Sequence, residues 1–184
     1  MFLDRDGTIN EDVGHLDRRD RLRLYPYSVD AVRLLNRAGF AVVVVTNQGG
    51  IARGLVEVSF VVELHAELRG RFAAGGADIE RFYHCPHDPH ATVPAYRTDC
   101  DCRKPAPGMV RRAASELGLD PTRSFLVGDK WSDIDLARAV GATPVLVRTG
   151  YGATQERQRP APAGTIVTDD LMSATVRMLA GGAR

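Results

Sequence analysis

An unbroken apolar run in the first third of the chain, residues 41–46, limits the possible folds more than any other feature. It places consecutive valines between Ala41 and Thr46. A strand with one face in water alternates apolar and polar residues, whereas a strand without this alternation is buried on both faces. Such strands belong to parallel sheets that carry helices on both sides. The run therefore predicts an α/β fold.

Segments with strand and helix patterns alternate along the rest of the chain. Such alternation implies parallel strands joined by right-handed crossovers. We expect one Rossmann-like domain over residues 1–184, with helices on both faces of the sheet. In the helix near residue 28, Ser28 is the expected N-cap and Gly39 the stop. Strands are expected at 1–3, 41–46, 79–83, 124–129, 144–147 and 165–167, helices at 28–38, 57–74, 107–117, 132–140 and 170–180, and a loop at 149–164.

Composition excludes several classes of protein. The formal net charge is +1 with 26% charged residues, so the chain lacks the excess of positive charge that is typical of nucleic-acid-binding proteins. No apolar run approaches the roughly 20 residues that span a bilayer, and no secretory signal is recognised. We therefore expect no nucleic-acid or membrane partner. We further expect a cytoplasmic protein that is a monomer. Only three residues precede Asp4, which is short for a central strand and indicates a start that is placed late or truncated.

Two aspartates follow that first short strand. Asp4 and Asp6 are separated by one residue, and alternate residues of a strand point to the same side. Gly7 then allows a sharp departure from the strand. One carboxylate can act as nucleophile while the other moves a proton. The alternative interpretation is an ordinary acidic turn.

Three further polar segments are expected at the same edge of the sheet, because ligands bind beyond the carboxyl ends of parallel strands. Each segment alone also fits a helix cap, a solvated cation or a turn. Their convergence on one edge favours a functional site. The segments are Thr46-Asn47-Gln48-Gly49, Arg103-Lys104-Pro105, and Gly128-Asp129-Lys130 with Asp133 one helical turn later.

The assembled residues suit phosphoryl transfer. Asp4 can attack phosphorus to form an aspartyl-phosphate, and Asp6 can give a proton to the leaving oxygen. The carboxylates of Asp4 and Asp129, with a backbone carbonyl, suit magnesium. Lys104 and Thr46 can hold the remaining phosphate oxygens.

All three cysteines fall within eighteen residues, an odd and clustered set that favours metal binding over disulfides. Cys85, His87, Cys100 and Cys102 supply the four ligands of a closed, structural zinc site. His84 and His90 are rival ligands. The zinc loop, about residues 84–103, would position Arg103 and Lys104.

The four polar segments resemble the signature motifs of the haloacid-dehalogenase superfamily of phosphatases. The resemblance implies that Asp4 is the nucleophile, Asp6 the acid and base, and Thr46 and Lys104 the phosphate-binding residues. It implies a catalytic magnesium on Asp4, Asp129 and the main-chain oxygen of Asp6, and a position for Asp133 from which it orients Lys130 or a metal-bound water. No insertion is large enough for a separate cap domain, so we expect a capless fold.

The zinc loop narrows the resemblance to the branch that contains the heptose bisphosphate phosphatases. The matching stretches are 3–10, 45–48, 50–54, 85–87, 101–105, 127–130 and 145–150. This branch implies removal of the 7-phosphate of a heptose 1,7-bisphosphate in nucleotide-activated heptose biosynthesis. It implies a small phosphorylated sugar as partner and substrate contacts from Asp12, Val13, Gly14, His15, Thr46, Asn47, Gln48, Gly49, Arg103, Lys104 and Lys130.

Other readings stay open at this stage. The histidinol phosphatases share the aspartate pair and the zinc loop, so histidinol phosphate or another small phosphomonoester is the alternative substrate. A zinc-stabilised binding module without catalysis would lack a catalytic group, and a DNA-end phosphatase would need a basic groove. The arginines at 18, 19, 21 and 23 fit a solvated surface better than a second phosphate site.

Overall fold

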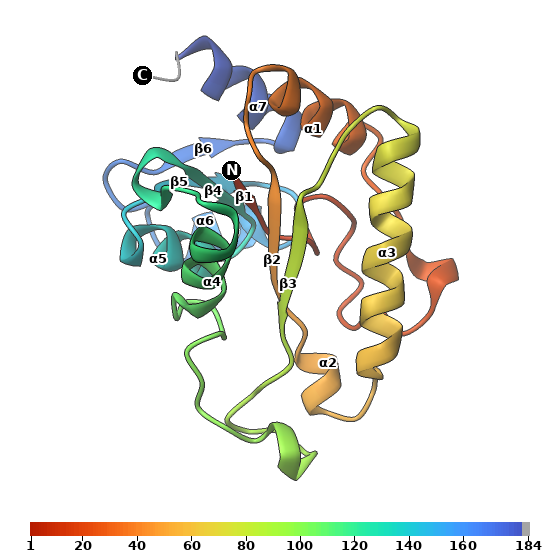
Figure 1. The fold of residues 1–184 in the computed structure, drawn as a ribbon. Helices are drawn as coiled ribbons and strands as arrows, with labels where there is room; N and C mark the ends of the chain where they lie inside the picture. Colours follow the sequence, from red (N-terminus) through yellow and green to blue (C-terminus); the bar gives the residue numbers. More distant parts are fainter. Residues whose placement is uncertain (182–184) are drawn as a thin grey trace.

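The computed structural model describes residues 1–181, so the last three residues of the expected 1–184 domain lie outside the described part. Its strands form one parallel sheet in the order β3-β2-β1-β4-β5-β6, which confirms the predicted α/β class (Figure 1). The strands are β1 (Phe2–Leu3), β2 (Val43–Asn47), β3 (Arg81–Cys85), β4 (Phe125–Gly128), β5 (Thr143–Val147) and β6 (Ile166–Thr168). The helices are α1 (Ser28–Arg37), α2 (Gly49–Ala52), α3 (Val58–Ala74), α4 (Gly108–Leu117), α5 (Trp131–Ala139), α6 (Gly152–Gln158) and α7 (Leu171–Ala180), with 3-10 turns η1 (Arg19–Arg21), η2 (Pro94–Tyr96) and η3 (Pro121–Arg123).

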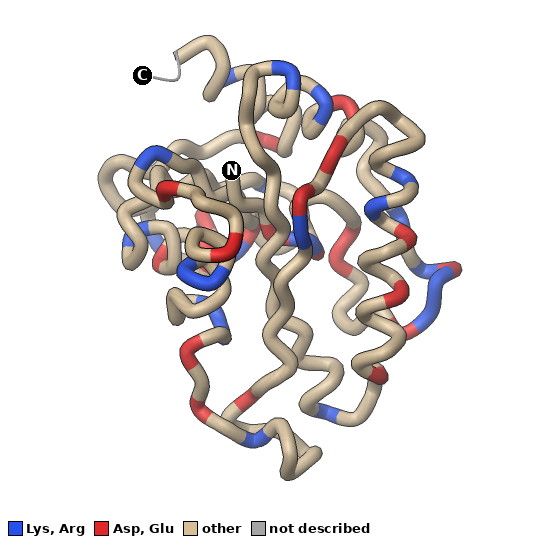
Figure 2. Tube along the Cα trace, in the orientation of Figure 1, with Lys and Arg blue, Asp and Glu red and all other residues tan. Residues whose placement is uncertain are grey.

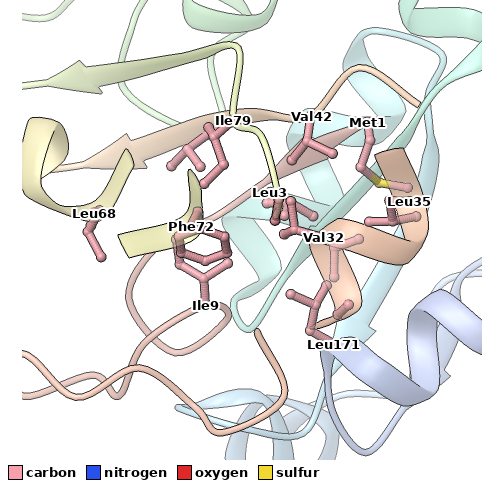
Figure 3. Packing of buried hydrophobic residues seen from close by; sticks show 14 of the residues in the cluster. Met1, Leu3, Ile9, Val32, Leu35, Val42, Leu68, Phe72, Ile79 and Leu171 are labelled. Carbon is pink, nitrogen blue, oxygen red and sulfur yellow. The ribbon is translucent and has the colours of Figure 1, made fainter. Parts of the chain in front are cut away.

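Helices cover both faces of the sheet because successive strand residues point to opposite sides. Leu3 and Val44 pack with buried residues of α1, α3 and α7, and Figure 3 shows part of this cluster around Leu3. Phe2 and Val45 pack on the other face, with buried residues of α4 and α5. The unbroken apolar run is therefore divided between two cores, as a doubly covered strand requires.

The short first strand is central and fully buried. Phe2 and Leu3 pair with β2 on one side and β4 on the other. The amino terminus of Met1 donates to the Ala41 carbonyl at 2.9 Å, and the N–H of Asp4 donates to the Val127 carbonyl at 2.8 Å. These bonds continue the ladder beyond both ends of β1, so Asp4 emerges from the middle of the sheet in a fixed direction.

Three local predictions were wrong. The stretch 149–164 is not all loop, because it contains α6, where Gln155 accepts hydrogen bonds that tie this helix to Trp131. Ser28 does not cap α1 but lies inside it, and its hydroxyl donates to the Ile9 carbonyl. The strand expected at 79–83 begins at Arg81 instead, because its register with β2 extends to the pair Asn47–Cys85.

Charged residues of both signs are mixed over the molecule, including along α3 (Figure 2). In the first loop, Arg19 pairs with Glu63 and Arg21 with Asp17, all at exposed positions. This fits the prediction of a solvated surface there. Among residues 1–181, no helix combines the length and the apolar character that crossing a membrane requires.

Candidate active site and candidate metal centre

The carboxyl ends of the three central strands bring together the residues that the sequence singles out. Asp4 follows β1, Thr46 lies in β2 and Asp129 follows β4, while Lys104 comes from the loop before α4. Within residues 1–181 all named strands belong to this one sheet. The edge holds a small cavity of about 70 Å³. Its lining residues are Asp4, Asp6, Asp12, Gly14, Thr46, Asn47, Lys104, Lys130 and Ser132.

Lys104 is a buried cation between two carboxylates. Its Nζ lies 2.7 Å from Asp4 Oδ1 and 2.6 Å from Asp133 Oδ1, and donates to the Val45 carbonyl at 3.0 Å. Burial alone would lower the pKa of Lys104, but the charges of Asp133 and Asp4 outweigh it and raise the pKa. The ammonium group therefore stays charged next to Asp4, where it can attract a phosphate.

Asp133 has two partners at the site. The prediction that it orients Lys130 or a metal-bound water agrees with its contact to Lys130, because its Oδ2 accepts from the backbone N–H of that residue at 3.1 Å. Its Oδ1 also pairs with Lys104, a contact that was not predicted. The side chain of Lys130 turns to Asp12, with Nζ and Oδ2 2.8 Å apart.

Three buried carboxylates form a compact acidic cluster. Asp4, Asp129 and Asp133 each offer an oxygen within 4.8 Å of the others. Asp129 Oδ2 accepts from the Tyr151 backbone N–H at 2.8 Å, whereas buried Asp129 Oδ1 has no hydrogen-bond partner among residues 1–181. Burial, and next the charge of Asp4, raises the pKa of Asp129 to about 8. An unpartnered carboxylate oxygen amid like charges fits a hard divalent cation such as magnesium.

Asp6 faces a different environment. Its carboxylate accepts hydrogen bonds from Arg5, Asn10 and Gln48 at 2.7–3.1 Å. Burial would raise the pKa of Asp6, but the charge of Arg5 and these hydrogen bonds outweigh burial and lower the pKa. Asp4 and Asp6 therefore have distinct partners, as two carboxylates with different roles require.

The expected substrate-contacting residues divide into two groups. Asp12, Gly14, Asn47 and Lys130 line the small cavity together with Thr46 and Lys104. Val13, His15, Gln48, Gly49 and Arg103 do not line it.

Several of these side chains bind other protein groups instead. The Asn47 amide bonds both the N–H and the carbonyl of Lys104, and Gln48 donates to Asp6 and Thr46. Arg103 donates to Asp88 at 2.9 Å and to the His87 carbonyl at 2.8 Å. Asn47 and Gln48 thus hold the loop and the carboxylate that face the cavity.

Three further residues near the site were not among the predicted site residues. Ser132 lines the cavity at the start of α5. Arg53 lies against His15, with Nη1 and Nε2 3.2 Å apart. Arg5 lies between Asp4 and Asp6 in the sequence, and this position alone indicated a contact with Asp6.

The predicted zinc ligands lie together. Cys85, His87, Cys100 and Cys102 each offer an atom within 4.8 Å of the others. Cys102 Sγ lies 3.0 Å from Cys85 Sγ, 3.1 Å from Cys100 Sγ and 3.3 Å from His87 Nδ1. Burial raises the pKa of the Cys85 thiol, and burial with the neighbouring thiols raises that of Cys102. Convergent thiols and an imidazole fit a tetrahedral metal, and of the three candidate histidines the cluster contains His87.

The metal centre adjoins the active-site edge. Cys85 ends β3 and pairs in register with Asn47, and Cys102 precedes Lys104 by two residues. A larger hollow of about 490 Å³ lies on the outer side of β3, beside His87 and Cys102. Asp4, Asp6 and Lys104 line the smaller, polar cavity and not this hollow, so the smaller cavity is the candidate active site.

The parallel sheet with carboxylates, a hydroxyl and a buried lysine at its carboxyl edge defines a haloacid-dehalogenase-type hydrolase. The HAD-hydrolase-like family matches residues 101–174. Proteins named D-glycero-beta-D-manno-heptose-1,7-bisphosphate 7-phosphatase are similar over most of their length. The one from Escherichia coli K12 is 43% identical over 88% of this chain and 85% of its own. The one from Pseudomonas aeruginosa is 39% identical over 97% of both.

Comparison with solved structures leads to the same family. The D,D-heptose 1,7-bisphosphate phosphatase of B. bronchiseptica, complexed with magnesium and phosphate, superposes with a TM-score of 0.88. It is 33% identical and covers 99% of this chain and 98% of its own. The phosphatase of the same name from Burkholderia thailandensis has a TM-score of 0.72 and 31% identity, over 97% of this chain and 96% of its own. The chain belongs to the family of heptose-1,7-bisphosphate 7-phosphatases.

Proposed function

We propose that this protein hydrolyses the 7-phosphate of D-glycero-D-manno-heptose 1,7-bisphosphate through an aspartyl-phosphate on Asp4. The observation that carries the proposal is the contact of Asp4 with buried Lys104 beside the acidic cluster. It occurs in a chain whose relatives bear the name of that activity. The cavity holds about 70 Å³, little more than two waters at ~30 Å³ each. It therefore suits one phosphoryl group, with the sugar outside on the open edge.

The first half of the reaction uses the two aspartates in turn. Asp4 attacks phosphorus, the bond from phosphorus to the sugar oxygen breaks, and Asp6 gives its proton to that oxygen. Asp6 is ionised in the free protein because its pKa is lowered. Binding of a phosphate dianion raises this pKa through like-charge repulsion and so favours the proton that Asp6 must donate.

The second half returns the residues to their starting state. Asp6, now a carboxylate, takes a proton from water as this water attacks the aspartyl-phosphate, and inorganic phosphate leaves. Lys104 and Thr46 hold the phosphate oxygens that do not react. Magnesium, held by the carboxylates of Asp4 and Asp129 and the main-chain oxygen of Asp6, would offset the negative charge of phosphate and nucleophile. Asp12 and Lys130, which line the cavity, would contact the substrate there.

The test of this function is Asp4→Asn together with a panel of substrates. We expect Asp4→Asn to lower kcat by at least about 10³-fold, because an amide cannot form the intermediate. Asp135→Asn, an exposed α5 carboxylate paired with Arg159, is the matched control and should keep full activity. Substantial turnover by folded Asp4→Asn would overturn the mechanism.

The panel of phosphate esters shows which substrate the protein prefers. The wild-type protein is compared by kcat/KM on both anomers of the heptose bisphosphate and on histidinol phosphate. We expect the bisphosphate to be preferred. A preference for histidinol phosphate or another phosphomonoester would reassign the substrate while leaving the roles of the aspartates in place.

We also propose that the four-ligand cluster binds structural zinc, since four protein ligands leave no open position for catalysis. His87→Asn should lose the metal, measured by atomic absorption, and lower Tm. His90→Asn, outside the cluster, should keep both. Full zinc content in His87→Asn would contradict the ligand set. Thiolate ligands further support a reducing compartment such as the cytoplasm, with residues 1–184 acting as one domain.

A further inference from the structure

Arg5 is the largest fully buried side chain of the described residues, and the proposed reaction gives it no role. Its guanidinium has only donors, all of which need acceptors once they are buried. Nε and Nη2 donate to the Asp6 carboxylate, with Nη2 2.7 Å from Asp6 Oδ2. Nη2 also lies 3.0 Å from Gln48 Oε1, and Nη1 lies 3.0 Å from His65 Nε2. Among residues 1–181, His65 is therefore the sole hydrogen-bond acceptor of Nη1.

The contact with Arg5 defines the tautomer of the His65 ring. Because arginine cannot accept, His65 Nε2 must supply the lone pair and its proton must sit on Nδ1. Burial, and next the charge of Arg5, lowers the pKa of His65 to about 2, so the ring is neutral. The ring is also fixed in place, since it is 6% exposed and stacks on Phe82 with centroids 4.7 Å apart.

These contacts connect an element outside the cavity to a residue that lines it. His65 belongs to α3, which lies alongside β3 in Figure 1, and it does not line the cavity. Asp6 does line it. Without the His65 acceptor, Arg5 Nη1 would be buried and unsatisfied, which costs more than most lost hydrogen bonds. The guanidinium would rotate toward another acceptor and lose the hydrogen bonds from Nε and Nη2 to the Asp6 carboxylate.

We propose that His65 is a positioning residue for proton transfer: by accepting from Arg5 Nη1, it fixes the guanidinium that holds the Asp6 carboxyl in its working orientation. The inference rests on the proposed role of Asp6 as the acid that protonates the leaving oxygen. His65 itself contacts neither substrate nor reacting atoms. It acts on Asp6 through its contact with Arg5.

The test compares three variants of His65 that differ in the acceptor. His65→Gln can place Oε1 near the position of Nε2, whereas the shorter His65→Asn cannot reach Arg5. His65→Leu keeps apolar volume and removes the acceptor. Leu68→Ala, a buried residue one turn later on α3, is the control for loss of packing alone. Thermal unfolding of every variant shows which of them are folded, and the Gln and Asn pair decides the question if the Leu variant does not fold.

The experiment measures how the loss of kcat/KM in each variant depends on the leaving group of the substrate. An alkyl phosphate such as the heptose bisphosphate needs its leaving oxygen protonated, whereas 4-nitrophenyl phosphate releases a stable phenolate. We expect His65→Asn and His65→Leu to lower kcat/KM for the alkyl phosphate by roughly 10- to 100-fold, and for 4-nitrophenyl phosphate by less than about threefold. His65→Gln should restore most of the loss, and KM should change little.

Equal losses on both substrates, or no loss in folded His65→Asn, would overturn the inference, because His65 would then only stabilise the fold. Failure of the proposed function is distinguishable. If the wild-type protein does not hydrolyse the heptose bisphosphate, the same comparison uses whichever alkyl phosphate it does hydrolyse.

Discussion

At the scale of single residues, Asp129 is a buried carboxylate with two unlike oxygens. Oδ2 accepts a hydrogen bond from the Tyr151 N–H, and Oδ1 has no hydrogen-bond partner in the described part of the chain. In the unfolded chain the pKa of this carboxyl is near 3.8, whereas in the folded protein its pKa is about 8. Between these values the folded state holds the extra proton. The contribution of this carboxyl to folding stability therefore falls as pH rises from about 4 to 8.

From this we predict a pH-dependent stabilisation by magnesium. The proton and the cation compete for the same carboxylate, so magnesium should raise Tm more at pH 8.5 than at pH 6. At a hundred times Kd the gain is about 2.7 kcal/mol, or roughly 5–10 °C. Differential scanning calorimetry at both pH values measures it.

Asp129→Asn separates this carboxylate from its neighbours. The variant should lose most of the magnesium-dependent shift in Tm at pH 8.5, while Asp135→Asn should keep it. A shift that is the same at pH 6 and 8.5, or that persists in Asp129→Asn, would mean that the cation binds elsewhere.

At the scale of elements, the loop between β5 and α6 packs directly against the site. Gly150 has a φ of +55°, and a Cβ there would lie 2.2 Å from Asp129 Oδ2 and 2.6 Å from Gly7 Cα. Thr149 Oγ1 donates to the Gly7 carbonyl at 2.6 Å in the same place. The loop is therefore joined to the turn that carries the aspartate pair, and only glycine fits at its closest approach.

We predict that Gly150→Ala displaces Asp129 and lowers kcat/KM by at least about tenfold, with a loss of stability of about 1–3 kcal/mol. Steady-state kinetics and urea unfolding measure the two effects. Gly164→Ala is the matched control, because Gly164 has a φ of +82° but no atom within 4 Å of its Cβ position. It should lose stability through backbone strain and keep its activity. Equal activity in the two variants would show that the collision at Gly150 is relieved without moving Asp129.

Elements with a strong local pattern could be predicted from the sequence. The valines of β2 must be buried on both faces, and polar residues after three strands must share an edge, so Asp4, Thr46 and Asp129 could be placed together. The helix α6 was missed because the glycines and prolines around it have the composition of a loop.

Long-range partners could not be predicted in the same way. Asp133 is three residues from Lys130 in sequence, yet its ion pair is with Lys104. His65 and Arg5 are 60 residues apart, and no periodicity connects a helix position to a residue in a turn. Such pairs depend on how α3 and the loop before α4 pack on the sheet, and side-chain packing leaves no mark on the local pattern of either segment.

At the scale of the whole molecule, the two cores and the active site meet at β1. Its two residues are fully buried, Phe2 toward the core of α4 and α5 and Leu3 toward the core of α1, α3 and α7. Asp4 follows directly and is held by the Val127 carbonyl. Stability and catalysis should therefore be linked through this strand more closely than through any surface element.

We predict that Leu3→Ala lowers the free energy of unfolding by about 2–5 kcal/mol, because it opens a cavity in the larger core (Figure 3). Val176→Ala, at a position 56% exposed on α7, should stay within about 0.5 kcal/mol of the wild type. Urea unfolding measures both. The activity of the folded Leu3→Ala protein should fall as well, since the strand that aims Asp4 at Lys104 loses its support on one face. A stability change near that of Val176→Ala would show that the core closes around the missing side chain, and that the hydrogen bonds of β1, rather than its packing, fix the direction of Asp4.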